Sequence, residues 1–103
     1  MKIINHGDWE AYVPDPRPEE LPANILFCRR KSDGVDWYEY QKELTDETVY
    51  CVVLNGRINP VFRDPSMLFP QYGTVLEIVD KDTVEIIAEY AGRKYDPETN
   101  TLV

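Results

Sequence analysis

The most regular pattern of apolar and polar positions in this sequence lies in residues 49–64, VYCVVLNGRINPVFRD. Two runs rich in β-branched residues flank Asn55-Gly56, and both of these residues tolerate the positive φ that a type I′ turn requires. The pattern therefore predicts a two-residue β-hairpin. Its register pairs Leu54 with Arg57, Val53 with Ile58, Cys51 with Pro60 and Val49 with Phe62.

This register gives the hairpin two faces of different character. One face carries only apolar residues, namely Val49, Cys51, Val53, Ile58, Pro60 and Phe62, whereas the other is mixed. A sheet of this kind buries its apolar face and leaves the other face partly in water. Pro60 cannot donate a ladder hydrogen bond, so we expect the second strand at a sheet edge or bulged at this point. We place the hairpin at the centre of the sheet's core.

The chain before this hairpin predicts further strands. Residues 2–5 and 9–13 flank His6-Gly7-Asp8 and predict a first, short hairpin. Four prolines within residues 14–22 impose an extended path, which suits either a stiff surface connector or a docking segment for an aromatic groove. Residues 24–30 predict a strand, and residues 31–34 a turn.

A first short helix is predicted over residues 37–44. Asp36 is a candidate N-cap with Glu39 as its capping-box partner, and apolar residues follow at helical spacing. Because aromatic residues also favour strands, a strand over residues 35–40 is the alternative.

A second helix is predicted after Asp82, which has Glu85 as a capping-box partner. Apolar residues then share one helical face, and Gly92 stands where a left-handed C-terminal cap is expected. A strand over residues 84–90 is the alternative.

The remaining elements complete an α+β pattern. Residues 64–70, DPSMLFP, predict a loop with one helical turn, whose large apolar side chains must be buried on the sheet or in a partner. Residues 74–79 predict a strand, and residues 94–103 predict a closing hairpin in which Asn100 tolerates a left-handed conformation. We therefore expect a single α+β domain over residues 1–103, with a small antiparallel sheet of about five strands and one or two short helices on one face.

Charge and hydropathy exclude several classes of protein. The chain has 103 residues and a net charge of −8, with 43% hydrophobic residues. Because a nucleic-acid-binding protein normally presents a basic patch, and residues 29–31 are the only basic run, we expect no nucleic-acid partner. No apolar run approaches the roughly 20 residues of a membrane span, and the N-terminal segment lacks the apolar core of a signal peptide. We expect no membrane association and a cytoplasmic location.

No pattern in the sequence predicts an active site. His6 is the only histidine, and we expect it in an exposed turn, because the acids near it match no metal-ligand spacing. Cys28 and Cys51 lie in apolar runs and are expected as reduced, buried thiols, with a disulfide as the alternative. The five glycines are scattered and form no phosphate-binding loop. We expect no cofactor, no metal and no catalytic residue.

Aromatic residues make up 12% of the chain and have two interpretations. They fill the core of a small domain, or some of them form a binding face for a sugar or a protein. We expect Trp9 and Tyr38 to be the most exposed of them.

Four strings in chain order carry a resemblance to a known group of proteins. They are HGDW at residues 6–9, the block at residues 20–44 that contains SDGVDWYEYQ, VFRDPSMLFPQYG at residues 61–73, and GRKYDPETNTL at residues 92–102. Together they resemble small phage and prophage proteins encoded among tail genes, near tail-fibre and tail-fibre-assembly proteins. In the closing motif of that group an aromatic residue often follows the glycine, where this chain has Arg93-Lys94.

The resemblance implies a non-enzymatic protein that acts by protein–protein contact, as a minor tail component or a tail-fibre assembly helper. Its partner would be a phage tail or tail-fibre protein, met in the host cytoplasm during assembly or in the tail of the virion, and homo-oligomers are compatible with this role. The alternative is a receptor- or carbohydrate-binding module that uses exposed aromatic residues. We expect the partner contacts to be made by Arg63, Met67, Leu68, Phe69, Trp9 and Tyr38, with an aromatic or aliphatic anchor of this chain buried in a groove of the partner that charges surround.

Overall fold

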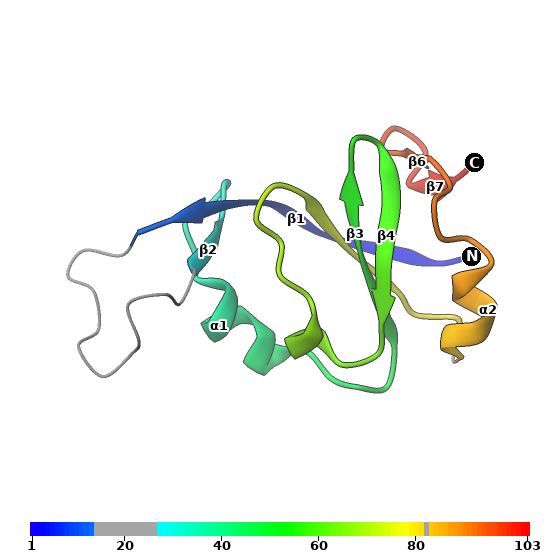
Figure 1. Cartoon of the computed structure of the whole chain (residues 1–103), viewed down its shortest axis with the longest axis horizontal. Helices are drawn as coiled ribbons and strands as arrows, with labels where there is room; N and C mark the ends of the chain where they lie inside the picture. Colours follow the sequence, from blue (N-terminus) through cyan, green and yellow to red (C-terminus); the bar gives the residue numbers. More distant parts are fainter. Residues whose placement is uncertain (14–26, 82) are drawn as a thin grey trace.

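The computed structural model describes residues 1–13, 27–81 and 83–103. Three parts of the sequence analysis lie outside the described residues: the predicted proline-rich connector, the beginning of the strand expected at residues 24–30, and Asp82. Five antiparallel strands form one sheet in the order β2-β1-β5-β3-β4, and a two-stranded hairpin, β6-β7, follows near the C-terminus (Figure 1). The strands are β1 (Ile3–Tyr12), β2 (Phe27–Arg30), β3 (Val49–Leu54), β4 (Arg57–Phe62), β5 (Thr74–Ile78), β6 (Tyr95–Asp96) and β7 (Thr101–Leu102). The α+β class and the five-stranded antiparallel sheet are confirmed.

The predicted β3–β4 hairpin forms, but its register changes along its length. Asn55 and Gly56 have φ angles of 52° and 79°, as a type I′ turn requires. Leu54 pairs with Arg57 and Val53 with Ile58, as predicted; beyond a bulge in β4, however, Cys51 pairs with Val61 and Tyr50 with Phe62. The extra residue in β4 reverses the faces that follow it. The pairs expected between Cys51 and Pro60 and between Val49 and Phe62 are therefore wrong.

The hairpin lies at one side of the sheet, and β5 is the central strand. The expectation of an edge strand with a bulge near Pro60 is confirmed, whereas the central position given to the hairpin is wrong. The mixed face is also more buried than expected, because Tyr50 and Val52 are 1% and 3% exposed.

The short hairpin predicted around His6-Gly7-Asp8 is wrong, since these residues lie within one long strand, β1. Its first half pairs with β5 and its second half with β2, and the register with β5 shifts between Asn5 and Asp8. Gly7 has a φ of 98°, and a Cβ at this position would lie 2.6 Å from Cδ of Arg30. The positive φ thus serves a bulge rather than a turn.

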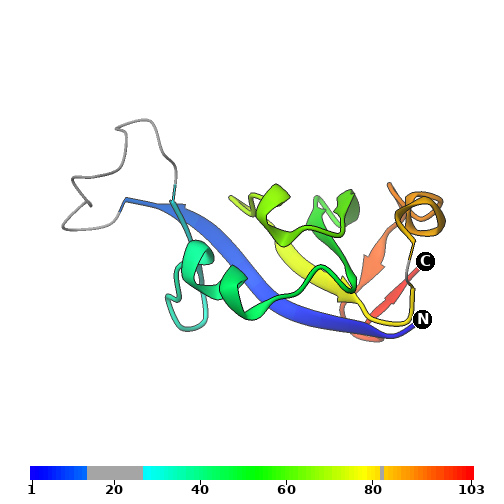
Figure 2. The ribbon, with the colours of Figure 1, turned by 90° about the horizontal axis from the view of Figure 1, so that it is seen from below.

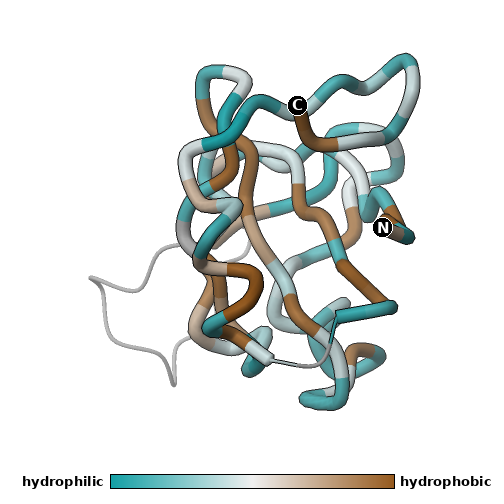
Figure 3. The backbone as a smooth tube through the Cα atoms, turned by 90° about the vertical axis from the view of Figure 1, so that its right-hand side faces the viewer, coloured by the Kyte–Doolittle hydropathy of each residue, from teal (hydrophilic) through white to brown (hydrophobic). Residues whose placement is uncertain are grey.

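Two apolar clusters lie on the two faces of the sheet. Neighbouring residues of β3 alternate between them: Cys51 belongs to the cluster with Leu76, Ile78 and Ile87, and Tyr50 to the cluster with Trp9, Trp37 and Leu68. Figure 3 shows the hydrophobic segments along the strands and the hydrophilic ones mainly in the turns. Cys28 and Cys51 are free, buried and in different clusters, as expected of reduced thiols.

Each face of the sheet carries one short helix, although we expected the helices on one face. Helix α1 (Trp37–Tyr40) continues as a 3-10 turn at residues 41–43 and contributes Trp37 to the Trp9 cluster. Helix α2 (Val84–Ala88) contributes Ile87 to the other cluster. Figure 1 shows the two helices near opposite ends of the long axis.

The caps of these helices agree in part with the sequence patterns. Asp36 caps α1 as predicted, by accepting a hydrogen bond of 2.8 Å from the Tyr38 N–H. The N-cap of α2 is Thr83, and Gly92 has the predicted positive φ, 84°. Both strand alternatives are wrong.

The predicted C-terminal hairpin covers the outer edge of β4. The Tyr95 N–H donates to the Gly56 carbonyl at 2.8 Å, and the Ile58 N–H donates to the Arg93 carbonyl at 3.0 Å. Asn100, at a φ of 55°, donates through Nδ2 to the Ile3 carbonyl at 2.8 Å. In Figure 2 this hairpin lies beside the N-terminal end of β1. The part of the β4 edge nearest the turn is therefore paired.

Candidate functional site

An uncharged hollow of about 350 Å³, here named the hairpin groove, opens beside the β3–β4 hairpin. Its lining comes from the hairpin and the loop at residues 63–73: Val52, Leu54, Phe62, Met67, Phe69, Gln71 and Tyr72. None of these residues is charged, although 29% of the chain is. Leu54, Met67, Phe69 and Tyr72 are 43%, 60%, 38% and 75% exposed. Exposed apolar side chains gathered around a hollow are typical of a binding site.

The local sequence explains why two side chains of this loop point outward. The Asp64 carboxylate accepts hydrogen bonds from the Ser66 N–H at 2.9 Å and the Ser66 hydroxyl at 2.7 Å, which begins the predicted helical turn at residues 65–67. Leu68 is in extended conformation and 1% exposed, and its carbonyl accepts a hydrogen bond of 3.1 Å from Trp37 Nε1. Met67 and Phe69, on either side of Leu68, are left exposed.

The end of the loop lies directly against β3. A Cβ at Gly73 would lie 2.4 Å from Cγ1 of Val52 and 2.6 Å from the Val53 carbonyl oxygen. The Gly73 carbonyl accepts a hydrogen bond of 2.9 Å from the Trp9 N–H. Only glycine permits this approach, which holds the neighbouring Tyr72 at the wall of the groove.

A row of aromatic rings continues from the groove toward β1. The ring centroid of Tyr38 lies 6.5 Å from that of Phe69 and 5.7 Å from that of Phe27, and Phe27 lies 6.1 Å from Tyr12. Tyr38 is half-buried, and desolvation raises the pKa of its hydroxyl. These distances are typical of favourable aromatic contacts.

The predicted contact residues divide into a surface group and a buried group. Met67 and Phe69 line the hairpin groove, Tyr38 adjoins Phe69, and Arg63 follows the groove residue Phe62. The predicted exposure of Trp9 and Leu68 is wrong, because they are 0% and 1% exposed. Trp9 packs edge-on against Trp37, with centroids 5.1 Å apart, and both belong to the cluster that contains Leu68.

Of the groove residues, only Met67 and Phe69 were predicted as contacts, and sequence reasoning missed Val52, Leu54, Phe62, Gln71 and Tyr72. Leu54 and Tyr72 are the exposed residues among those missed. Leu54 was assigned to the mixed face of the hairpin, and an exposed apolar residue next to a turn is the only local signal it offers. Tyr72 stands between Gln71 and Gly73 in a loop, where nothing local distinguishes an exposed ring from a buried one.

A polar network, separate from the hairpin groove, links β1, α1 and β5. His6 Nδ1 lies 2.7 Å from the Tyr40 hydroxyl, and His6 Nε2 lies 2.7 Å from Glu77 Oε1. The Thr48 hydroxyl donates to Glu77 Oε2 at 2.7 Å. The His6 and Glu77 side chains are 10% and 14% exposed, so the expectation of an exposed turn histidine is wrong.

This polar network contains a histidine and a carboxylate, the residue types of an acid–base pair. Its side chains, however, form their hydrogen bonds with one another. Both ring nitrogens of His6 and both carboxylate oxygens of Glu77 have partners within the fold. Arg30 lies over the Tyr40 ring at 4.5 Å and donates to the His6 carbonyl at 3.1 Å. The network therefore connects the β1 bulge to α1 and β5.

The described part of the chain contains no group of three or more His, Cys, Asp or Glu side chains that could hold a metal ion. Within the same residues, none of the helices has the length and apolar character of a membrane span. No protein-family model matches the chain, and no curated protein is significantly similar to it.

Proposed function

We propose that this protein acts without catalysis, by binding a phage tail or tail-fibre protein through the hairpin groove, as a minor tail component or an assembly helper. One observation supports the groove as the contact site: four exposed apolar side chains line one uncharged hollow in a strongly charged chain. The class of partner comes from the resemblance of the four strings to small proteins encoded among tail genes.

The exposed apolar surface sets the scale of the interaction. Full burial of a large apolar side chain is worth about 1.5–3 kcal/mol relative to its exposed state. Because Met67 is 60% and Phe69 38% exposed, each has roughly half of this stabilisation, about 1 kcal/mol, left to gain in a complex. Removal of both side chains should then weaken binding by about 2 kcal/mol, or about thirty-fold.

The first experiment locates the protein. Mass spectrometry of purified phage particles, beside the lysate of the source strain, separates a tail component from a helper that leaves before the particle is complete. Stoichiometric amounts in particles indicate a tail component, and abundance in the lysate alone indicates an assembly helper.

The second experiment tests the groove. Binding to tail and tail-fibre proteins from those particles is measured by biolayer interferometry for the wild type and for a double variant, Met67→Ser with Phe69→Ser. The control is Ile86→Ser, which alters a similarly exposed apolar residue on α2, 42% exposed. We expect the double variant alone to lose affinity while keeping its melting temperature. Undiminished binding by the double variant, or no binding by the wild type, would refute the proposal.

A receptor- or carbohydrate-binding module is the second candidate, because the Tyr72 ring is 75% exposed and adjoins the Gln71 amide in the groove wall. Sugars pack on exposed aromatic rings and take hydrogen bonds from nearby amides. A glycan array in which the wild type binds and Tyr72→Ala does not would favour this candidate, and an array without hits would count against it.

A further inference from the structure

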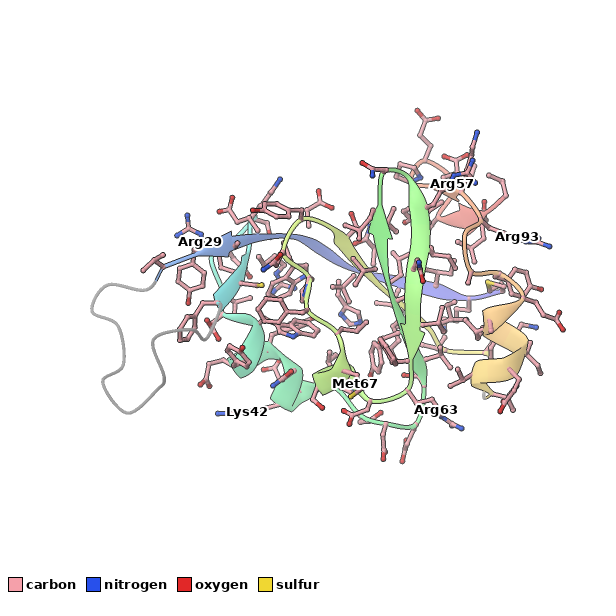
Figure 4. The ribbon with its side chains drawn as sticks, viewed as in Figure 1. Arg29, Lys42, Arg57, Arg63, Met67 and Arg93 are labelled. Carbon is pink, nitrogen blue, oxygen red and sulfur yellow. The ribbon has the colours of Figure 1, made fainter. Side chains whose placement is uncertain are left out.

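Two cations lie beside the hairpin groove at the turn of the β3–β4 hairpin. Leu54, in the groove wall, pairs across the hairpin with Arg57, and an isolated antiparallel bridge pairs Arg57 in turn with Lys94. Residues directly opposite each other in antiparallel strands lie on the same face. Leu54, Arg57 and Lys94 therefore form one row across the strands. The row begins at the apolar wall of the groove and continues with two positively charged side chains. Figure 4 shows Arg57 near the turn of the hairpin and Met67 near its other end.

The pairing of Arg57 with Lys94 is of the type that brings side chains closest. The hydrogen bonds that flank it join Ile58 to Arg93 and Gly56 to Tyr95, so Arg57 and Lys94 form a non-hydrogen-bonded pair. Like charges directly opposite each other destabilise a sheet.

Among the residues that the structure describes, no ion pair neutralises this repulsion. In the described part of the chain, Arg29, Arg30 and Lys42 each form an ion pair with an acidic side chain. Arg57 and Lys94 form none, as is also true there of Lys2, Lys31, Arg63, Lys81 and Arg93. Arg57 and Lys94 are both exposed, although acidic residues outnumber basic ones by 19 to 11 in the chain. An unfavourable pair that the fold leaves uncompensated is the kind of feature that a ligand can relieve.

Arg57 is also held in place before any ligand arrives. Its Nη1 donates a hydrogen bond of 2.8 Å to the Gly92 carbonyl. The neighbouring Arg93 is oriented as well, since its guanidinium lies 4.8 Å from the centroid of the Tyr90 ring. A guanidinium fixed in this way loses little side-chain freedom on binding, and its remaining N–H groups suit a carboxylate.

The other charges near the groove balance one another. A second hollow, of about 260 Å³, lies on the other side of Tyr72 and contains Lys31 together with Asp8. Beyond Phe62, Arg63 is followed by Asp64, whose pKa is lowered by its hydrogen bonds from Ser66. At the turn of the hairpin Arg57 and Lys94 are paired, and Asp96 lies two residues beyond Lys94, with its carboxylate accepting a hydrogen bond from the Glu98 N–H.

We infer that the groove and the Arg57–Lys94 pair form one binding site for a protein segment in which an apolar side chain is accompanied by carboxylates. This inference rests on the proposed function and names the chemistry of its partner. The apolar side chain fills the groove, and the carboxylates bind the cations and screen their repulsion. A short acidic segment feels mainly the local pair, because charges are screened beyond about 8 Å at physiological ionic strength. A nucleic acid would extend beyond the pair and would be repelled by the rest of the protein, whose net charge is −8.

Three fluorescein-labelled peptides test the inference by fluorescence anisotropy. Each has a central Leu-Trp pair, flanked on both sides by two Glu, two Gln or two Lys residues. We expect the Glu peptide to bind about ten-fold more tightly than the Gln peptide in low salt, and this advantage to shrink in high salt. Arg57→Gln and Lys94→Gln should each remove most of the advantage, whereas the control Lys2→Gln should not. Met67→Ser with Phe69→Ser should weaken binding of both the Glu and the Gln peptide.

The outcomes separate the inference from the proposed function. Equal binding of the Glu and Gln peptides, weakened only by the groove variant, would overturn the inference and leave the groove as a contact site. No binding of the Glu peptide would also overturn it, while the tail-protein experiment decides the proposed function independently. Displacement of the Glu peptide by a single-stranded oligonucleotide at lower concentration than by unlabelled peptide would assign the cations to nucleic acid, against the inference.

Discussion

Leu68 is the buried residue between two exposed residues of the candidate site. The variant Leu68→Ala measures how much its burial contributes to the free energy of unfolding. Its side chain is 1% exposed within a cluster that contains Trp9, Trp37, Tyr50 and Val75. Truncation of a buried leucine to alanine costs about 2–5 kcal/mol, through lost apolar transfer and the cavity left behind. Its carbonyl can still accept from Trp37 Nε1, since the backbone is unchanged. We therefore expect a loss of about 3 kcal/mol in the free energy of unfolding.

The adjacent Met67→Ala is the matched control. Met67 is 60% exposed, so its truncation should change the free energy of unfolding by no more than about 0.5 kcal/mol. Urea denaturation followed by tryptophan fluorescence suits the test, because both tryptophans of the chain lie in the Leu68 cluster. In a domain of this size, Leu68→Ala should lower the melting temperature by roughly 10–20 °C. Equal stability of the two variants would refute the division of this loop into a buried residue and its exposed neighbours.

The same structure yields four further predictions. Gly7→Ala should lower the free energy of unfolding by about 1–3 kcal/mol, because φ of Gly7 is 98° and the new methyl would lie 2.6 Å from the Arg30 side chain. The control Gly34→Ala, also at positive φ but in open space, should lower it less. Equal denaturation midpoints of the two variants would contradict this. Burial raises the pKa of the Cys28 thiol to about 11 and that of Cys51 to about 12, so neither should react with a thiol reagent at pH 8 as fast as the urea-unfolded chain does. Because the unfolded chain releases these protons first, stability should fall as the pH rises from about 9 toward 11, and a flat profile there would count against buried thiols. Lys94→Glu should raise stability by about 0.5–1 kcal/mol in low salt, since it places opposite charges across from Arg57, and a lower melting temperature would argue against repulsion in the native pair.

Several elements could be predicted from short stretches of sequence because their cause is local. The Asn55-Gly56 turn depends on the φ angles that two residues tolerate, and the cap at Asp36 depends on a carboxylate two residues before an N–H group. The turn at residues 65–67 and the closing hairpin around Asn100 have the same kind of origin. Met67 and Phe69 could be proposed as contacts because their loop carries more apolar side chains than it can itself bury.

The tertiary structure decided which strands pair and which face each residue takes. Gly7 permits a positive φ equally well in a turn or in a bulge, and only the pairing of β1 with β5 and β2 selects the bulge. That bulge and the one in β4 add one residue each to their strands, and a shift of one residue reverses the face of every side chain beyond it. Trp9 and Phe62 owe their positions to these shifts, and Arg57 meets Lys94 through a contact between segments far apart in the chain. Local backbone preferences can be read from neighbouring residues, whereas strand partners and faces depend on the burial of the whole sheet, which no short stretch of sequence contains.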